Sequence, residues 1–121
     1  MALKKILIVD DSSTELLNLK EIVASTGTPI VTATSGKQAV EKAKSEKPDL
    51  IFMDIVMDEV DGYKACRQLR EDEDTNNIPV IFVSSKHQRA DKIWAEKQGG
   101  RGFVTKPYEK EDILEQINIF S

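Results

Sequence analysis

Cysteine and histidine are nearly absent from this sequence, which has one of each, and aromatic residues make up only 6% of it. A single thiol, Cys66, cannot form an intrachain disulfide or a metal site of several thiolates. Cys66 also falls in a helical pattern where a small, half-buried residue is ordinary, which predicts a structural thiol. His87 follows a predicted strand, in a loop where we expect it to face solvent.

Long hydrophobic runs and clusters of positive charge are also missing. The N-terminal residues lead directly into a short apolar segment of strand length, without a signal-peptide hydrophobic region or a stretch that could span a bilayer. The 17 basic residues are outnumbered by 21 acidic ones, for a formal net charge of −4, and no basic face stands out. We therefore expect a cytoplasmic protein that neither inserts into a membrane nor binds nucleic acid directly.

The 121 residues suit one compact domain with a single core. No internal repeat, low-complexity tract or Pro/Gly-rich linker divides the sequence. We expect residues 1–121 to form a single domain with no output domain, so that any output passes through a partner protein.

Three uninterrupted apolar runs are present, each too short for a helix and rich in β-branched or aromatic residues. They cover residues 6–9, 50–53 and 80–83, and they are typical of strands buried on both faces. Residues 30–33 and 102–105 are weaker strand candidates, and the polar mixture of 30–33 suits a sheet edge. The sequence therefore predicts five strands.

Between these runs, apolar residues recur at helical spacing. Two helix starts carry capping boxes, Ser12 with Glu15 and Ser35 with Gln38, in which paired side chains satisfy free amides reciprocally. Trp94, on the fourth helical pattern, is expected to pack on the sheet rather than lie exposed. Because the gaps are long enough for crossover helices, the strands should be parallel. The predicted fold class is α/β, a doubly wound sandwich.

Polar side chains stand at the carboxyl ends of four of the five predicted strands. The segments at these ends are Asp10-Asp11, Asp54, Ser84-Ser85 and Lys106-Pro107. Each alone has an ordinary explanation as a helix cap, a loop residue or a solvated amine. The carboxyl ends of parallel strands meet at one edge of a sheet, however, which predicts three carboxylates, a hydroxyl and an amine together. That combination favours a functional site.

The predicted carboxylates repel one another, by about 4 kcal/mol for each pair at roughly 4 Å. A divalent ion together with Lys106 balances their formal charge. Oxygen ligands that leave positions open for water and phosphate suit Mg²⁺, and soft-metal ligands are absent. The sequence therefore predicts a magnesium site.

With these motifs in place, the sequence resembles the CheY-like receiver domains of two-component response regulators over nearly its whole length. The matching stretches are residues 8–11, 54–62, 78–85 and 106–108. The resemblance implies a flavodoxin-like sheet with strand order 2-1-3-4-5 and five helices on both faces. It also implies a signalling domain rather than an enzyme, capable only of self-phosphorylation and slow autodephosphorylation.

The resemblance further implies a set of roles around Asp54. Asp54 accepts a phosphoryl group from a histidine kinase or phosphotransfer protein. Asp10, Asp11, Asp54 and the backbone carbonyl of Val56 hold Mg²⁺. Phosphoryl transfer needs mainly in-line positioning of the reacting groups and neutralisation of the negative charge on the phosphoryl oxygens.

The same resemblance assigns Lys106 and Ser84 to the phosphoryl oxygens, and Ser84 and Phe103 to a switch. On phosphorylation, Ser84 moves toward the phosphate and Phe103 turns inward. This change reshapes the face of the fourth helix, fifth strand and fifth helix, where a downstream target protein binds. The Lys106-Pro107 peptide bond is expected to be cis.

The sequence departs from the common pattern after Asp54, where the loop 57–62 lacks a proline and gains charge. Gly99–Gly102 is also richer in glycine than usual. Residues 91–94 and 98–99 resemble receivers of type IV pilus twitching-motility systems.

Three other functions are weighed against the receiver. A haloacid dehalogenase-type phosphatase needs an acid two residues after the nucleophile, where Val56 stands. A phosphate-binding P-loop needs a glycine pattern that Gly36-Lys37 lacks. A degenerate receiver that binds partners without phosphorylation remains open, although the complete set of site residues argues against it.

Overall fold

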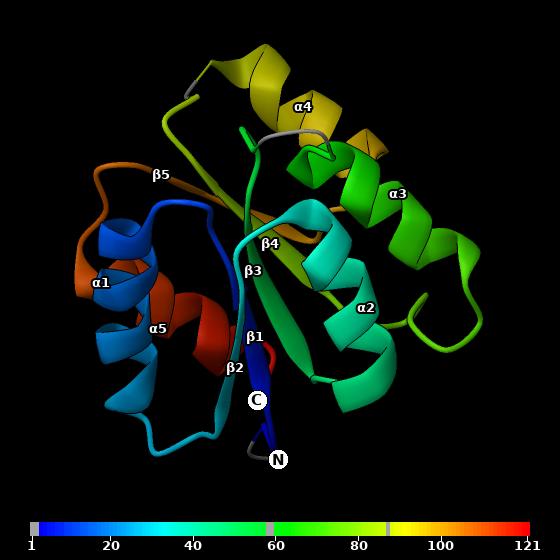
Figure 1. Cartoon of the computed structure of the whole chain (residues 1–121). Helices are drawn as coiled ribbons and strands as arrows, with labels where there is room; N and C mark the ends of the chain where they lie inside the picture. The colour runs from blue at the N-terminus through cyan, green and yellow to red at the C-terminus, as the bar shows by residue number, and fades with distance from the viewer. Residues whose placement is uncertain (1–2, 58–59, 87) are drawn as a thin grey trace.

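The computed structural model describes residues 3–57, 60–86 and 88–121. Its centre is a five-stranded parallel sheet in the order β2-β1-β3-β4-β5 (Figure 1). The predicted fold class and strand order are confirmed. His87, which we expected to face solvent, lies outside the described residues. So do Asp58 and Glu59, the charged residues of the loop that lacks a proline.

The most hydrophobic strands occupy the middle of the sheet. The elements are β1 (Ile6–Val9), β2 (Ile30–Ala33), β3 (Leu50–Asp54), β4 (Val80–Ser84) and β5 (Gly102–Thr105). Every residue of β1, β3 and β4 is buried, whereas most residues of β2 and β5 are partly exposed. The two weaker candidates therefore form the edges, as their more polar sequences require.

Helices cover both faces of the sheet (Figure 1). They are α1 (Ser13–Ala24), α2 (Gly36–Glu46), α3 (Gly62–Glu71), α4 (Arg89–Lys97) and α5 (Lys110–Ile119). Buried residues of α2, α3 and α4 share one hydrophobic cluster, and those of α1 and α5 share the other. The sheet lies between the two clusters, which is the doubly wound arrangement.

The two capping boxes form only in part. The hydroxyls of Ser12 and Ser35 accept hydrogen bonds from the backbone N–H groups of Glu15 and Gln38 as predicted. The reciprocal bonds are wrong: the Gln38 side chain accepts from the backbone of Thr34, and the Glu15 carboxylate contacts a lysine on another element. Gln38 therefore caps the residue before its own N-cap, and a distant lysine takes the Glu15 side chain away from its helix start.

Trp94 does not pack on the sheet, which corrects the prediction. Its side chain is 52% exposed, whereas the adjacent Ala95 is buried. Neighbouring positions on a helix differ by about 100° around its axis, so the contact of Ala95 with the core turns Trp94 outward. Cys66, expected to be half-buried, is fully buried on α3, and burial raises the pKa of its thiol.

In the part of the chain that the structure describes, no helix has the length and apolar character needed to cross a bilayer.

Asp61 begins α3 as its N-cap, and its carboxylate accepts a hydrogen bond of 2.8 Å from the backbone N–H of Lys64. Replacing it by alanine leaves that amide without its partner. We expect Asp61→Ala to lower the free energy of unfolding by about 1 kcal/mol, measured by urea denaturation. Asp61→Ser, which retains a capping oxygen, should lose much less; equal losses in both variants would contradict the capping role.

Candidate functional site

The carboxyl ends of the strands bring the predicted polar residues together at one edge of the sheet. Asp10, Asp11 and Asp54 each present an oxygen, and these oxygens all lie within 4.8 Å of one another. Asp10 and Asp54 are buried, at 3% and 8% exposed, and Asp11 is exposed. The predicted cluster of three carboxylates therefore exists.

Strand register explains this meeting of distant residues. Val9 pairs with Met53, so the next residues, Asp10 and Asp54, leave adjacent strands at the same level. Asp54 in turn pairs with Val83, and Ser84 follows one position later. Each strand thus delivers one polar side chain to the same edge.

Gly62 lets the start of α3 lie directly against Asp54. A Cβ at this position would lie 2.2 Å from the backbone oxygen of Asp54, far inside van der Waals contact. The backbone N–H of Gly62 donates to the carbonyl of Ile55 at 2.8 Å. The absence of a side chain at residue 62 therefore lets α3 pack closely against the end of β3, which carries the central carboxylate.

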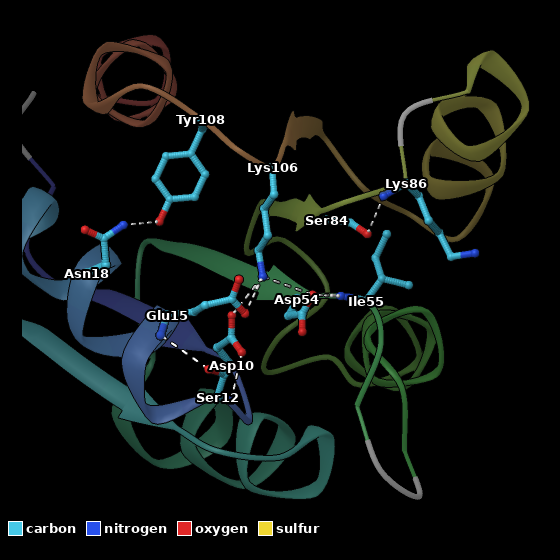
Figure 2. A network of polar contacts seen from close by, with 10 residues as sticks. All are labelled: Asp10, Ser12, Glu15, Asn18, Asp54, Ile55, Ser84, Lys86, Lys106 and Tyr108. Carbon is cyan, nitrogen blue, oxygen red and sulfur yellow. Dashed lines mark hydrogen bonds and ion pairs between the residues drawn. The ribbon is translucent and has the colours of Figure 1, made fainter.

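Lys106 reaches into the carboxylate cluster from the end of β5 (Figure 2). Its Nζ lies 3.2 Å from Oδ2 of Asp10, 3.0 Å from Oε2 of Glu15 and 3.7 Å from Oδ1 of Asp54. The Lys106-Pro107 peptide is cis, as predicted. The backbone N–H of Lys106 donates to the carbonyl of Ser84 at 2.8 Å, which joins β4 to β5 at the site.

Burial and crowding change the proton affinity of the central carboxyl. The pKa of Asp54 is raised to about 6, mainly by burial and further by the charges of Asp10 and Glu15. The Lys106 ammonium and the Ile55 backbone N–H oppose this rise. Burial also lowers the pKa of Lys106, but its hydrogen bond to Glu15 and the other two carboxylates outweigh burial and raise it. At neutral pH, Asp54 is therefore mostly ionised and Lys106 is protonated.

Two of the remaining predicted residues, Ser84 and Val56, line a cleft of about 680 Å³. Ser84 is buried with its hydroxyl at the edge of this cleft, where it accepts from the backbone N–H of Lys86 at 3.2 Å. Val56 lines the cleft with a 63% exposed side chain. Phe103, by contrast, is half-buried on β5 against the α2-α3-α4 cluster and does not line the cleft.

The donor set fits Mg²⁺. The clustered carboxylates offer hard oxygen atoms, and the cleft beside them has room for further oxygen ligands. No cysteine or histidine lines this cleft within the described residues, so the donors do not suit a soft metal.

Sequence reasoning missed three residues that line the cleft beside Lys106. Glu15 was interpreted only as a capping residue, and Asn18 and Tyr108 were given no site role. The Asn18 amide donates to the Tyr108 hydroxyl at 3.3 Å (Figure 2). The three-residue spacing of Glu15 and Asn18, which places them on one face of α1, is the signal that could have found them.

Comparisons with known proteins agree with this geometry. Residues 6–118 match the family model described as the response regulator receiver domain. The protein PilH of Pseudomonas aeruginosa is 45% identical over 94% of this chain and 94% of its own length. The chemotaxis protein CheY of Thermotoga maritima is 36% identical, over 95% of both chains.

A solved structure shares the fold at lower identity. The receiver domain of the sensor histidine kinase PA1611 from Pseudomonas aeruginosa, described with a magnesium ion in its active-site cleft, superposes with a TM-score of 0.90. It is 24% identical, and the match covers 98% of each chain. With its sheet order, its family match and its similarity to PilH of the twitching-motility subgroup, this chain belongs to the response regulator receiver family.

Proposed function

We propose that this chain is a two-component response regulator that accepts a phosphoryl group on Asp54 in a Mg²⁺-dependent reaction. The observation that carries the proposal is the meeting of Asp10, Asp11 and Asp54 within 4.8 Å, with the Lys106 amine beside them. The phosphoryl donor is a histidine kinase or a phosphotransfer protein. The chain acts as a signalling domain rather than as a multiple-turnover enzyme.

Asp10, Asp11, Asp54 and the backbone carbonyl of Val56 would hold the magnesium ion. Bound there, Mg²⁺ supplies positive charge that neutralises phosphoryl oxygens. Support comes from the all-oxygen donor set and from the related receiver domain of PA1611, whose structure is described with magnesium in its cleft.

Asp54 is the nucleophile. A bond forms between one of its carboxylate oxygens and phosphorus as the phosphorus–nitrogen bond of the donor phosphohistidine breaks, and that electron pair returns to the imidazole nitrogen. Because the pKa of Asp54 is about 6, the carboxylate is ionised at neutral pH and needs no general base. The Lys106 ammonium and the Ser84 hydroxyl would bind the phosphoryl oxygens, a role supported by the 3.7 Å distance between the Lys106 amine and Asp54.

Ser84 and Phe103 form the proposed switch to the α4-β5-α5 face. Ser84 moves toward the phosphate and Phe103 turns inward, which changes the surface offered to a downstream target protein. Ile93 and Trp94 on α4 are both exposed, so apolar contact area is available there. We further propose that residues 1–121 act as one cytoplasmic receiver domain whose output is this partner contact rather than nucleic-acid binding.

The test uses a small acyl phosphate or phosphoramidate donor, with and without Mg²⁺, and measures intact mass. We expect one phosphoryl adduct on the parent protein in the presence of Mg²⁺, and none on Asp54→Asn. An adduct on Asp54→Asn would show that a residue other than Asp54 accepts the phosphoryl group. Absence of any adduct on a parent protein that binds Mg²⁺, with histidine kinases as well as small donors, would favour a receiver that binds partners without phosphorylation.

A further inference from the structure

Glu15 carries a carboxylate at the site for which the proposed phosphoryl transfer has no use. Its Oε2 lies 3.0 Å from the Nζ of Lys106, closer than either Asp10 or Asp54. Asp10 is a proposed metal ligand, and Asp54 is a proposed ligand and the nucleophile. Glu15 is not part of that carboxylate cluster, yet it holds the amine that the phosphoryl group needs.

The position of Glu15 is fixed by the first turn of α1. Its backbone N–H donates to the Ser12 hydroxyl at 3.4 Å, and the backbone N–H of Ser12 donates to Oδ1 of Asp10 at 2.9 Å. One turn later, Asn18 donates to the Tyr108 hydroxyl. Glu15 and Asn18 therefore present one face of α1 to the segment after β5 (Figure 2). The bond to Ser12 and the bond between Asn18 and Tyr108 flank the ion pair of Glu15 with Lys106.

The phosphoryl group and the carboxylates compete for one ammonium group. An ammonium has three N–H donors, and Lys106 already lies within 4 Å of three carboxylates. Two of these contacts, to Asp10 and Glu15, are hydrogen bonds, whereas Asp54 lies 3.7 Å from the amine. A phosphoryl group on Asp54 therefore competes with Asp10 and Glu15 for the charge and the position of the ammonium. Asp10 is buried, whereas the Glu15 side chain is 48% exposed, so Glu15 is the partner that water can solvate at little cost once it is released.

We propose that Glu15 is a positioning residue that holds the Lys106 amine in the unphosphorylated protein and competes with the phosphoryl group for it. Glu15 thereby lowers the affinity of the site for phosphoryl anions and sets the donor concentration needed for phosphorylation. The inference rests on the proposed function of Asp54 and Lys106. It predicts different effects on the two ligands: removing the Glu15 charge strengthens binding of the phosphoryl anion but does not strengthen binding of Mg²⁺.

The test measures the affinity for trifluoroberyllate, a stand-in for a phosphoryl group on a carboxylate, in saturating Mg²⁺ by calorimetric titration. The variants are Glu15→Gln, Glu15→Ala and Glu21→Gln. Glu21 is an exposed residue of the same helix, so its variant is a control for the loss of one negative charge. Both Glu15 variants should bind the anion about two to five times more tightly than the parent, the range expected for a partly exposed ion pair, and Glu21→Gln should not.

Two further readouts separate this role from a purely structural one. The gain in anion affinity should shrink as salt rises, because screening weakens the competing ion pair. With an acyl phosphate donor, the half-saturating donor concentration should fall while the maximal rate changes less. Far-UV circular dichroism and thermal unfolding show that each variant is folded, and Glu15→Ala tests the same prediction if Glu15→Gln does not fold.

The outcomes distinguish the two proposals. Equal or weaker anion affinity in folded Glu15 variants, beside a parent that binds the anion, overturns the role of Glu15 and leaves the proposed function standing. If Glu21→Gln gains as much anion affinity as the Glu15 variants, the loss of one negative charge explains the gain, and the role of Glu15 is again overturned. A parent that binds Mg²⁺ but neither binds trifluoroberyllate nor accepts a phosphoryl group overturns the proposed function itself.

Discussion

Asp54→Asn should unfold at a higher temperature than the parent protein when Mg²⁺ is absent. Asp54 is buried, and this burial raises the pKa of its carboxyl to about 6, so the folded protein disfavours the charge despite Lys106 nearby. Relative to the unfolded chain, this shift corresponds to about 3 kcal/mol of lost stability at neutral pH. Asparagine removes the charge and keeps an oxygen that can accept the Ile55 N–H. We expect the unfolding temperature to rise by roughly 10–15 °C.

The pH dependence of this difference has a definite sign. Because the folded-state pKa of Asp54 lies above its model value of 3.8, the folded state holds more protons at this site than the unfolded chain between about pH 4 and pH 6. The contribution of Asp54 therefore destabilises the protein progressively as pH rises through this window. The advantage of Asp54→Asn should be absent below about pH 4 and complete above about pH 6.

Differential scanning calorimetry in a chelating buffer measures the effect. Asp74→Asn is a suitable control, because Asp74 is exposed in the turn between α3 and β4 and its loss changes the net charge equally. With saturating Mg²⁺, the difference in unfolding temperature between Asp54→Asn and the parent should vanish or change sign, because only the parent retains the full set of metal ligands. A variant that melts at or below the parent without Mg²⁺ contradicts the destabilisation that burial and the neighbouring carboxylates impose on the Asp54 charge.

Much of the site could be predicted because it depends on strand order rather than on side-chain detail. The apolar runs of β1, β3 and β4 identify the central strands, and a parallel sheet brings the residues after them to one edge. Asp10, Asp54 and Ser84 therefore follow from sequence pattern alone. The same logic extends to Lys106 at the end of β5.

Residues whose roles depend on tertiary contacts were harder to predict. Glu15 fits a capping box in the sequence, but the amine of Lys106, 91 positions away, takes its carboxylate. Trp94 lies on an apolar helical pattern, yet Ala95 occupies the buried position on α4. In both cases local propensity is a weak guide because a competing long-range contact decides where the side chain points.

Lys106→Met should destabilise the metal-free protein and abolish tight binding of phosphoryl anions while sparing Mg²⁺. Without the ammonium, Asp10, Asp54 and Glu15 lose their shared counter-charge, and Asp10 and Asp54 are both buried. Breaking such a pair costs about 3 kcal/mol, so the unfolding temperature without metal should fall. Mg²⁺ restores positive charge to the cluster and should recover much of that loss.

The affinities provide the sharper test. Removal of a neighbouring cation should leave Mg²⁺ affinity equal or higher, whereas loss of a charged hydrogen bond to the phosphoryl oxygens should weaken trifluoroberyllate binding by roughly tenfold or more. Methionine keeps an apolar stem of similar length, so comparison with Lys106→Ala separates packing by the lysine methylenes from the effect of charge. If Lys106→Met loses Mg²⁺ affinity entirely, the amine acts through the metal ligands rather than on the phosphoryl group, and the division of roles proposed for this cleft is wrong.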